Sequence, residues 1–459
     1  MYALIIVALL GILLLYIGLF KKYQLLMPVG LSGLIAALLV SILEVNQHKV
    51  WFNNMIMLND LALAFNVSMI FFCIIFFLFS REYYKGIYES LAENYALFCF
   101  SLVGAMLLTS FTNLIMLFLG LEIMSIPLYI LAGAKKKSLR SNEASFKYFL
   151  LGSFASAFLL LGITLMYGFT ASFFLTDIRI FILSHSGALP LAFKTGILFM
   201  LFGLAFKLAA TPFHFWTPDV YEGSPSLVST YMATIVKMAS FAALWRLFTL
   251  MLMPVTEGIQ IMFWVLAFLS MSVGNITALW QQNFKRFIAY SGIGNTGFML
   301  ILFIIGDTNL GRLLLYYLVS YSFSVVIGFF VFYVVKKNSD RGENLSIFDG
   351  LWYRNRKLAV ALMVALFSLS GIPVFSGFWA KYFVFYYAVS MHFYTLTIIG
   401  ILLSLVAVYY YLTVVKRIIS KPSENSPITI EFTSLLAIFI LTSAIVILGF
   451  YPFIFGLPT

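Results

Sequence analysis

Five charged residues lie inside long apolar stretches of the sequence, where a charge is costly and functional by default. They are Glu122, Lys147, Lys207, Lys237 and Lys381. Burial disfavours the charged form of a lysine, and a nearby carboxylate restores it. Moving a glutamate relative to a buried lysine would therefore drive proton uptake and release. These residue types predict a proton relay, in which water and hydroxyl side chains connect the lysines.

Two prolines interrupt the apolar stretches that carry two of these lysines. Pro212 follows Lys207 by one helical turn, and Pro373 precedes Lys381. Proline removes a backbone donor, and a broken membrane span is tolerated only where protein or a water-filled cavity lines it. His214, just after the first break, could relay protons because histidine titrates near neutral pH. It could equally be a plain hydrogen-bonding group.

Each charged residue also has a simpler explanation. Lys147 lies near the end of its apolar stretch, so its side chain could reach the membrane surface. Glu122 could form a structural ion pair, and the residues around Lys381 could simply pack against neighbouring helices. We interpret TPDVYEGSP, which contains Asp219 and Glu222, as a solvated turn rather than as a mouth that attracts protons.

Composition identifies the class of protein. Of 459 residues, 63% are hydrophobic and 10% are charged, against about 25% charged residues in soluble domains. The chain is therefore a polytopic membrane protein in a lipid bilayer. The net charge of +11 reflects basic cytoplasmic loops rather than nucleic-acid binding. Cys73 and Cys99 lie in apolar stretches and indicate neither a disulfide framework nor an iron–sulfur site, and no metal-binding motif is present.

Apolar runs of about 20 residues, the length that crosses a bilayer, predict an all-α protein of about 14 transmembrane helices. The predicted spans are 2–20, 24–43, 60–80, 93–110, 112–134, 143–169, 191–217, 227–250, 258–280, 284–306, 310–335, 358–388, 393–415 and 428–452.

Charge placement supports this count of spans. Most of the 28 Lys and Arg residues fall in alternate loops, on one side of the predicted membrane. The positive-inside rule makes that side cytoplasmic and places both termini on the outer side. The basic residues predicted on the outer side are Lys49, Arg179, Lys194, Arg246 and Arg312.

A faint internal repeat organises the spans. We predict N-terminal helices in 1–92, a first five-helix repeat in 93–250, a second repeat in 258–417 and a C-terminal helix in 428–459. Five spans are an odd number, so consecutive copies have opposite orientation. Each copy contains one broken helix, and paired broken helices in inverted halves indicate an ion site near the middle of the membrane.

Several strings resemble the antiporter-like membrane subunits of respiratory complex I, the proton-pumping NADH:quinone oxidoreductase. They are FLGLEIMSIPLYIL, EASFKYFLLGSFASAFLLLG, FKLAATPFHFWTPDVYEGSPSLVSTYMATIVKMA, NFKRFIAYSGIGNTGFML and LSGIPVFSGFWAKYFVF. TPDVYEGSP, and a lysine rather than a glutamate at Lys381, are similar to the subunit N branch of this family. The resemblance runs from about the third span to the thirteenth.

This resemblance implies a role for each buried charge. Glu122 matches the glutamate of the fifth span, and the four lysines match those of the sixth, seventh, eighth and twelfth spans. The family holds no redox cofactor in this subunit, because NADH or another donor and quinone react elsewhere in the complex. The implied partners are an M-like subunit and small membrane subunits, and the implied location is the bacterial plasma membrane.

Two alternatives remain open at this stage. The chain could be a subunit of a multisubunit cation/proton antiporter, which shares the fold and the lysines. It could also be a structural spacer between proton-active neighbours, in which the lysines stabilise the fold without carrying protons. The antiporter alternative differs from the first interpretation in its partner subunits. The spacer alternative differs in the effect of replacing Lys207, which would change stability but not proton translocation.

Overall fold

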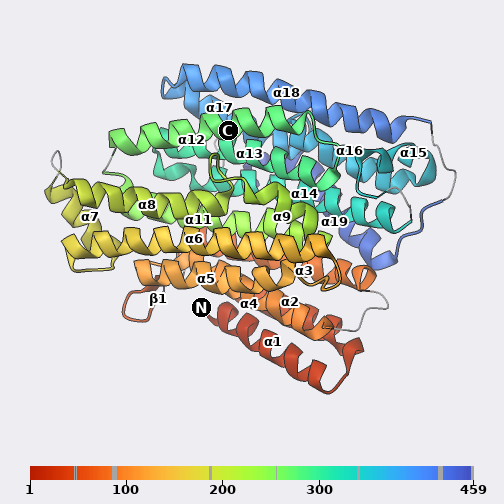
Figure 1. Ribbon diagram of the computed structural model, residues 1–459, viewed down its shortest axis with the longest axis horizontal. Coiled ribbons are helices and arrows are strands. Elements are labelled where there is room, and N and C mark those ends of the chain that lie inside the picture. The colour runs from red at the N-terminus through yellow and green to blue at the C-terminus, as the bar shows by residue number, and fades with distance from the viewer. Residues whose placement is uncertain are drawn as a thin grey trace. The chain divides into compact units, whose positions relative to one another are not determined.

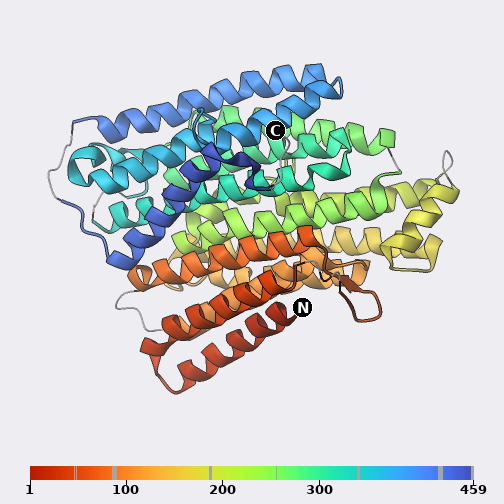
Figure 2. The same cartoon turned by 180° about the vertical axis from the view of Figure 1, so that it is seen from behind.

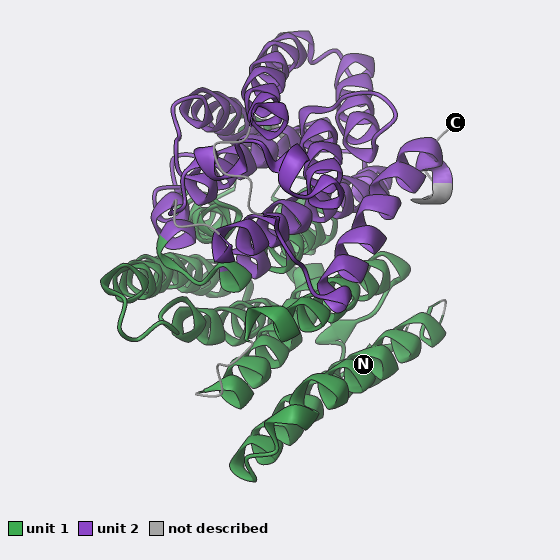
Figure 3. Cartoon of the chain, turned by 90° about the vertical axis from the view of Figure 1, so that its right-hand side faces the viewer, with its two compact units in different colours: residues 1–209, 223–228, 235–261 green, residues 210–222, 229–234, 262–459 purple. Residues whose placement is uncertain are grey.

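The computed structural model describes residues 1–45, 47, 49–84, 90–185, 189–254, 256–338, 342–421 and 427–455. Long helices dominate these residues, as Figure 1 shows from one side and Figure 2 from behind. The chain divides into two compact units, coloured separately in Figure 3. Unit 1 contains residues 1–209, 223–228 and 235–261, and unit 2 contains residues 210–222, 229–234 and 262–459.

Unit 1 is built from the N-terminal helices and a short hairpin. Its elements are α1 (Tyr2–Leu19), η1 (Tyr23–Leu25), α2 (Leu26–Leu43), β1 (Val50–Trp51), β2 (Ile56–Met57), α3 (Asp60–Tyr83), α4 (Leu91–Ser110), α5 (Leu114–Ala132), α6 (Leu139–Thr170), α7 (Leu175–Ser184), α8 (Leu191–Leu208), α11 (Lys237–Leu247) and η3 (Phe248–Leu252). The two strands are antiparallel, with Val50 opposite Met57. Helix α4 packs against α1, α3, α5 and α11, so it lies at the centre of this unit.

Unit 2 holds the C-terminal helices. Its elements are α13 (Phe284–Ile305), η4 (Thr308–Leu310), α14 (Gly311–Lys337), η5 (Leu345–Phe348), α15 (Leu351–Arg354), α16 (Arg356–Ser370), α17 (Ser376–Ser390), α18 (Tyr394–Ile419), α19 (Phe432–Phe450) and η6 (Pro452–Phe455). The chain passes between the units within α9 (Trp216–Gly223), α10 (Ser226–Tyr231), η2 (Met232–Val236) and α12 (Thr256–Ala278). Helix α14 packs against α13, α16, α17 and α19.

The helices account for the predicted number of spans. Among the described residues, 13 helices are long and apolar enough to cross a membrane. The remaining predicted span, 358–388, holds α16 and α17, of 15 residues each, which is about 22 Å per helix and too short to cross the bilayer alone. The all-α polytopic prediction is therefore confirmed.

The two predicted breaks occur where the prolines lie. Helix α8 ends at Leu208, and Ala209 has a positive φ of 57°, so Pro212 falls between α8 and α9. Helix α16 ends at Ser370, and Gly371 takes a φ of 85°, a conformation that costs glycine little. Pro373 then falls between α16 and α17.

The structure corrects our interpretation of TPDVYEGSP. Instead of a solvated turn, Trp216–Gly223 forms helix α9. Pro218 lies in the first turn of this helix, where a missing N–H costs nothing. Asp219 also lies in the first turn, where a negative charge is favourable. The sequence signals that suggested a turn are those of a helix start.

Candidate functional site

Lys207 lies in the last turn of α8, directly before the first break. Lys207 is only 4% exposed, although its side chain carries an ammonium group. The chain can place a lysine here because α8 ends one residue later and packs against α6 and α11. The lysine is therefore fixed at the end of a half-helix in the interior of unit 1.

The ammonium group of Lys207 is held by hydroxyl groups of α5. It donates hydrogen bonds to Ser125 Oγ at 2.8 Å and to Tyr129 OH at 3.1 Å. Its Nζ also lies 5.3 Å from the ring centroid of Tyr129 and 5.7 Å from that of Tyr148. Aromatic faces attract cations, so this pocket stabilises the ammonium, and none of the carboxylates that the structure describes lies at contact distance from it.

Glu122 lies on α5 one turn before Ser125, yet it forms no ion pair with Lys207 in the described part of the chain. Its carboxylate accepts a hydrogen bond from Ser156 of α6 instead. Glu122 is half-buried, whereas Lys207 is buried. The structure thus leaves the two relay candidates unpaired on different helices: Lys207 of α8 contacts Ser125 of α5, which lies one turn after Glu122.

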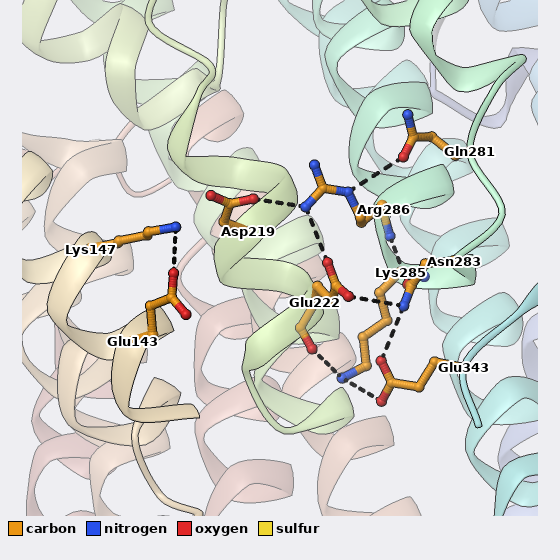
Figure 4. A network of polar contacts seen from close by, with 9 residues as sticks. All are labelled: Glu143, Lys147, Asp219, Glu222, Gln281, Asn283, Lys285, Arg286 and Glu343. Atoms are coloured by element: carbon orange, nitrogen blue, oxygen red, sulfur yellow. Dashed lines mark hydrogen bonds and ion pairs between the residues drawn. The ribbon is translucent and has the colours of Figure 1, made fainter. Parts of the chain in front are cut away.

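Lys147 is separate from this pocket. It lies on α6 and pairs with Glu143 at 2.7 Å, with its side chain 38% exposed (Figure 4). This is an i,i+4 pair on one helix face. No described contact joins Lys147 to Lys207, so the structure does not bring this candidate to the other relay residues.

Lys237 is buried, with 4% of its surface exposed, and begins α11. The five residues before it, Met232–Val236, form the π-helical turn η2. Such turns are rare and frequently occur at functional sites. Helix α11 packs against α4 and α8, so Lys237 belongs to the same unit as Lys207.

The segment around Pro212 carries buried polar atoms that lack partners. Among the described residues, no hydrogen bond reaches Thr211 Oγ1, His214 Nδ1 or Thr217 Oγ1. His214 is 5% exposed, and its ring contacts those of Phe215 and Tyr290. Buried polar atoms in proteins are usually satisfied by protein or ordered water. The first break is therefore a place suited to bound water, as a proton relay requires.

Lys381 is held differently, by the broken end of α16. Its Nζ donates to the backbone carbonyls of Leu369 at 2.9 Å and Ser370 at 3.2 Å. These carbonyls lack intrahelical partners because α16 ends at Ser370. The C-terminal end of a helix carries partial negative charge and favours a cation. The break at Pro373 therefore supplies the acceptors for this lysine.

A small cavity adjoins Lys381, with a volume of about 10 Å³, room for about one water molecule. Hydroxyl and amide groups of α13, α14 and α16 line it together with the lysine. The lining residues are Asn295, Tyr317, Ser320, Tyr321, Ser368, Leu369, Gly377, Ala380 and Lys381.

Unit 2 also contains an ionic cluster, and Figure 4 shows its members other than Lys336. Arg286 contacts Asp219 at 2.7 Å and Glu222 at 3.1 Å. Lys285 contacts Glu343 at 3.4 Å, and Lys336 pairs with the same carboxylate. We call these six residues the ionic cluster. It joins α9 to the start of α13 and the end of α14, so Asp219 and Glu222 are paired carboxylates, although both side chains are still partly exposed.

Electrostatics within the ionic cluster favour the charged form of Glu343. Burial opposes its ionisation, but Lys285 and Lys336 outweigh that effect and hold the pKa of this carboxyl below its ordinary value. Asn283 contributes a further hydrogen bond to the carboxylate, at 3.4 Å. The same Asn283 caps α13 through Lys285 N and Arg286 N, which fixes the two basic residues.

The sequence interpretation missed the residues that hold the lysines. Ser125 and Tyr129 follow Glu122 at helical spacings of three and seven residues, so they share its face of α5. That spacing could have identified them. The carbonyl groups that hold Lys381 come from the backbone, and only the Gly371 and Pro373 break signals them.

Comparison with known proteins identifies the family of this chain. Residues 112–407 match the family described as NADH:quinone oxidoreductase/Mrp antiporter, TM. The chain is 38% identical to NADH-quinone oxidoreductase subunit N of Flavobacterium psychrophilum over 98% of both chains. It is 36% identical to NADH-quinone oxidoreductase subunit N of Trichlorobacter lovleyi over 96% of this chain and 91% of that one.

Solved structures give the same result. A chain of respiratory complex I from Thermus thermophilus superposes with a TM-score of 0.85 at 30% identity, covering 98% of this chain and 97% of that chain. A chain of the Mrp complex from Dietzia has the same fold, with a TM-score of 0.88 at 16% identity, covering 98% of this chain and 94% of that one. The chain thus belongs to the NADH:quinone oxidoreductase/Mrp antiporter membrane family, and within it to the NADH-quinone oxidoreductase subunit N group.

Proposed function

We propose that this chain is a proton-translocating membrane subunit of the N type in a complex-I-type NADH:quinone oxidoreductase. The observation that carries this proposal is Lys207, a buried lysine at the end of a broken helix that is held by hydroxyl groups rather than by a carboxylate. Both hydroxyl oxygens accept from the ammonium. Ser125 donates its own hydrogen to the backbone carbonyl of Leu121 at 2.6 Å, so Tyr129 is the hydroxyl that can donate to a neutral amine. The pocket can therefore serve both protonation states of the lysine.

In this proposal, Glu122 controls the protonation of Lys207. A carboxylate near the lysine favours the ammonium form, and its withdrawal favours proton release. Glu122 is held by Ser156 in this structure, which corresponds to the withdrawn state. Lys237 and Lys381 accept the proton in turn, and His214 and water at the first break assist. Lys147, paired with Glu143 at the surface, exchanges protons with the aqueous side.

The driving force comes from other subunits, because this chain supplies no redox chemistry in our proposal. NADH or another donor and quinone would react elsewhere in the complex. The neighbours would be an M-like subunit and small membrane subunits, in the plasma membrane of a bacterium, with both termini on the outer side. Moving one charge across 100 mV costs about 2.3 kcal/mol, so the relay requires input from those neighbours.

The test replaces Lys207 in the assembled complex. Lys207→Ala should lower both quinone-reductase rate and proton translocation in sealed vesicles by more than about tenfold, because a proton-transfer group contributes at least that much. Lys194→Ala, at an exposed lysine of the same helix α8, is the matched control and should leave both rates unchanged. If Lys207→Ala leaves both rates unchanged in intact complexes, the chain is a spacer and the relay is wrong.

A second candidate function is a subunit of a multisubunit cation/proton antiporter. The shared family and the fold likeness to the Mrp complex favour it. Purification from native membranes separates the two proposals. Co-purification with iron–sulfur proteins and quinone-reductase activity supports the complex-I assignment, whereas a redox-inactive complex that exchanges cations for protons supports the antiporter assignment.

A further inference from the structure

Two asparagine–tyrosine pairs with the same geometry lie in unit 2. Tyr317 of α14 donates its hydroxyl hydrogen to Asn295 Oδ1 of α13, at 3.0 Å. Tyr410 of α18 donates in the same way to Asn275 Oδ1 of α12, also at 3.0 Å. Both asparagines are buried, with 4% exposure for Asn295 and 1% for Asn275. Only the first pair lines the cavity beside Lys381.

The orientation of the Asn295 amide is fixed by its own helix. Its Nδ2 donates to the backbone carbonyl of Ser291 at 2.9 Å. A carbonyl oxygen can only accept a hydrogen bond, so the nitrogen of the amide must face it and the oxygen must face Tyr317. Asn295 Oδ1 can in turn only accept, which commits the single hydroxyl hydrogen of Tyr317 to Asn295.

This commitment determines what Tyr317 presents to the cavity. With its hydrogen directed to Asn295, the tyrosine oxygen offers only lone pairs to the space that it shares with Lys381. The backbone carbonyls of Leu369 and Ser370, which contact the lysine directly, are also acceptors only. The ammonium form of Lys381 therefore meets acceptors on each of these sides.

We propose that Asn295 is a positioning residue for the Lys381 site, because it fixes the Tyr317 hydroxyl as a hydrogen-bond acceptor toward the cavity. The inference rests on the proposed function, in which Lys381 takes up and releases protons. Asn295 reaches the lysine only through Tyr317 and any water in the cavity. Its effect is on the balance between the charged and neutral forms of Lys381.

Other titratable groups surround the same tyrosine. Tyr321 shares the cavity, and Tyr411 faces Tyr317 from α18. Tyr411 is hydrogen-bonded to Ser291 at 2.6 Å, and the Tyr410 ring packs against it at a tilt of 55°. Apart from Lys381, the titratable groups described around Tyr317 are thus phenols, which are neutral at physiological pH.

The experiment measures proton translocation against pH in liposomes that contain the assembled complex. Asn295→Leu, of similar size, frees the Tyr317 hydrogen to turn toward the lysine. Tyr317→Phe removes the oxygen and keeps the ring, so it tests the idea even if Asn295→Leu fails to assemble. Each should move the midpoint of the pH profile to lower pH by about one unit, because the ammonium loses one oriented acceptor.

Matched controls come from the second pair. Asn275→Leu and Tyr410→Phe remove the same hydrogen bond away from the cavity, and their pH midpoints should equal that of the unaltered complex. The double variant Asn295→Leu/Tyr317→Phe should shift the midpoint no further than either single variant, because both act through one hydrogen bond.

The outcomes distinguish this inference from the proposed function. A midpoint for Asn295→Leu or Tyr317→Phe that matches the controls, or single shifts that add in the double variant, would overturn the role of Asn295. Full proton translocation in Lys381→Met would instead overturn the relay itself. If Lys381→Met abolishes translocation and both single variants shift the pH profile, the inference is supported.

Discussion

The two broken helices hold their lysines with different chemistry. In unit 1, Lys207 donates to the side-chain hydroxyls of Ser125 and Tyr129. In unit 2, Lys381 donates to the backbone carbonyls of Leu369 and Ser370. Hydroxyls can accept or donate, whereas carbonyls only accept. The first pocket can adapt to a neutral amine, and the second favours the ammonium.

The charged groups outside the two lysine pockets also differ, in how firmly their surroundings hold them. Unit 1 has an exposed pair on a single helix, Lys147 and Glu143. Unit 2 has the ionic cluster, in which Lys285 is buried and three helices meet (Figure 4). Isolated surface pairs contribute little to stability, but partly buried networks contribute more. The Lys147–Glu143 pair can thus rearrange at little cost, whereas the ionic cluster holds its charges in place; unit 1 has a buried ion pair as well, between the N-terminal amine and Glu44.

The largest expected effect compares loss of the two lysines. Lys381→Met leaves the carbonyls of Leu369 and Ser370 without their partner, at about 1–3 kcal/mol for each unsatisfied buried group. Lys207→Met leaves hydroxyls that can turn and find other partners. Thermal unfolding of the purified complex should therefore show a larger loss of stability for Lys381→Met. Equal losses would mean that the kind of acceptor does not matter.

The second prediction compares the two ionic groups as pH falls. The folded-state pKa of Glu343 is lowered from 4.5, so its stabilisation is present above that pH and is lost as pH falls through the lower folded value. Glu343→Gln should cost about 2 kcal/mol at pH 7 and flatten the acid limb of the stability curve. Glu143→Gln, at the exposed pair, should cost less than about 0.5 kcal/mol. Urea unfolding between pH 7 and pH 3 measures both, and similar costs would contradict the contrast between the units.

Much of this arrangement follows from sequence. Span length, the positions of Pro212 and Pro373 and the five intramembrane charges predicted an all-α membrane protein with two breaks, and the structure confirms the breaks. Among the described residues 13 helices are long and apolar enough to cross a membrane, and α16 and α17 both fall in the remaining predicted span, 358–388. Helix α9 was misread because Pro218 near its start and Gly223 at its end resemble turn signals.

The partners of the lysines could not be predicted in the same way. Lys381 is held by backbone atoms, which no residue type identifies. Glu122 and Lys207 have the residue types of an ion pair, yet Ser156 holds the carboxylate. Which side chains pair depends on how α5, α6 and α8 pack against one another. Sequence periodicity predicts the helix face on which a residue lies, but not which other helix packs against that face. The repeat boundaries and the relay roles remain predictions.

The third prediction separates the effect of the Tyr129 hydroxyl on Lys207 from the effect of the Tyr129 ring. Tyr129→Phe keeps the aromatic face but removes the hydrogen bond at 3.1 Å. A hydrogen bond to a charged group contributes about 1.5 kcal/mol or more, so proton translocation should fall roughly tenfold. In unit 2, Phe298→Leu removes only the ring 5.2 Å from Lys381 Nζ and should lower translocation about twofold. Assays in proteoliposomes compare the two, and an effect of Phe298→Leu that equals or exceeds that of Tyr129→Phe would mean that rings, not hydroxyls, govern these sites.

The smallest effects concern the residues that end the two half-helices. Gly371 and Ala209 both have positive φ, 85° and 57°, a conformation that costs alanine about 1 kcal/mol relative to glycine. Gly371→Ala should lower stability by about that amount, and its new Cβ would lie 3.2 Å from Lys381 Cδ, so it should also reduce proton translocation slightly. Ala209→Gly should raise stability by up to about 1 kcal/mol without moving Lys207, because its Nζ is fixed by α5. If thermal unfolding shows that Gly371→Ala loses stability and Ala209→Gly gains it, both helices end with a residue whose positive φ favours glycine. The two breaks would then differ only in the groups that contact their lysines. A loss of stability in Ala209→Gly would mean that the backbone conformations of the two breaks differ as well.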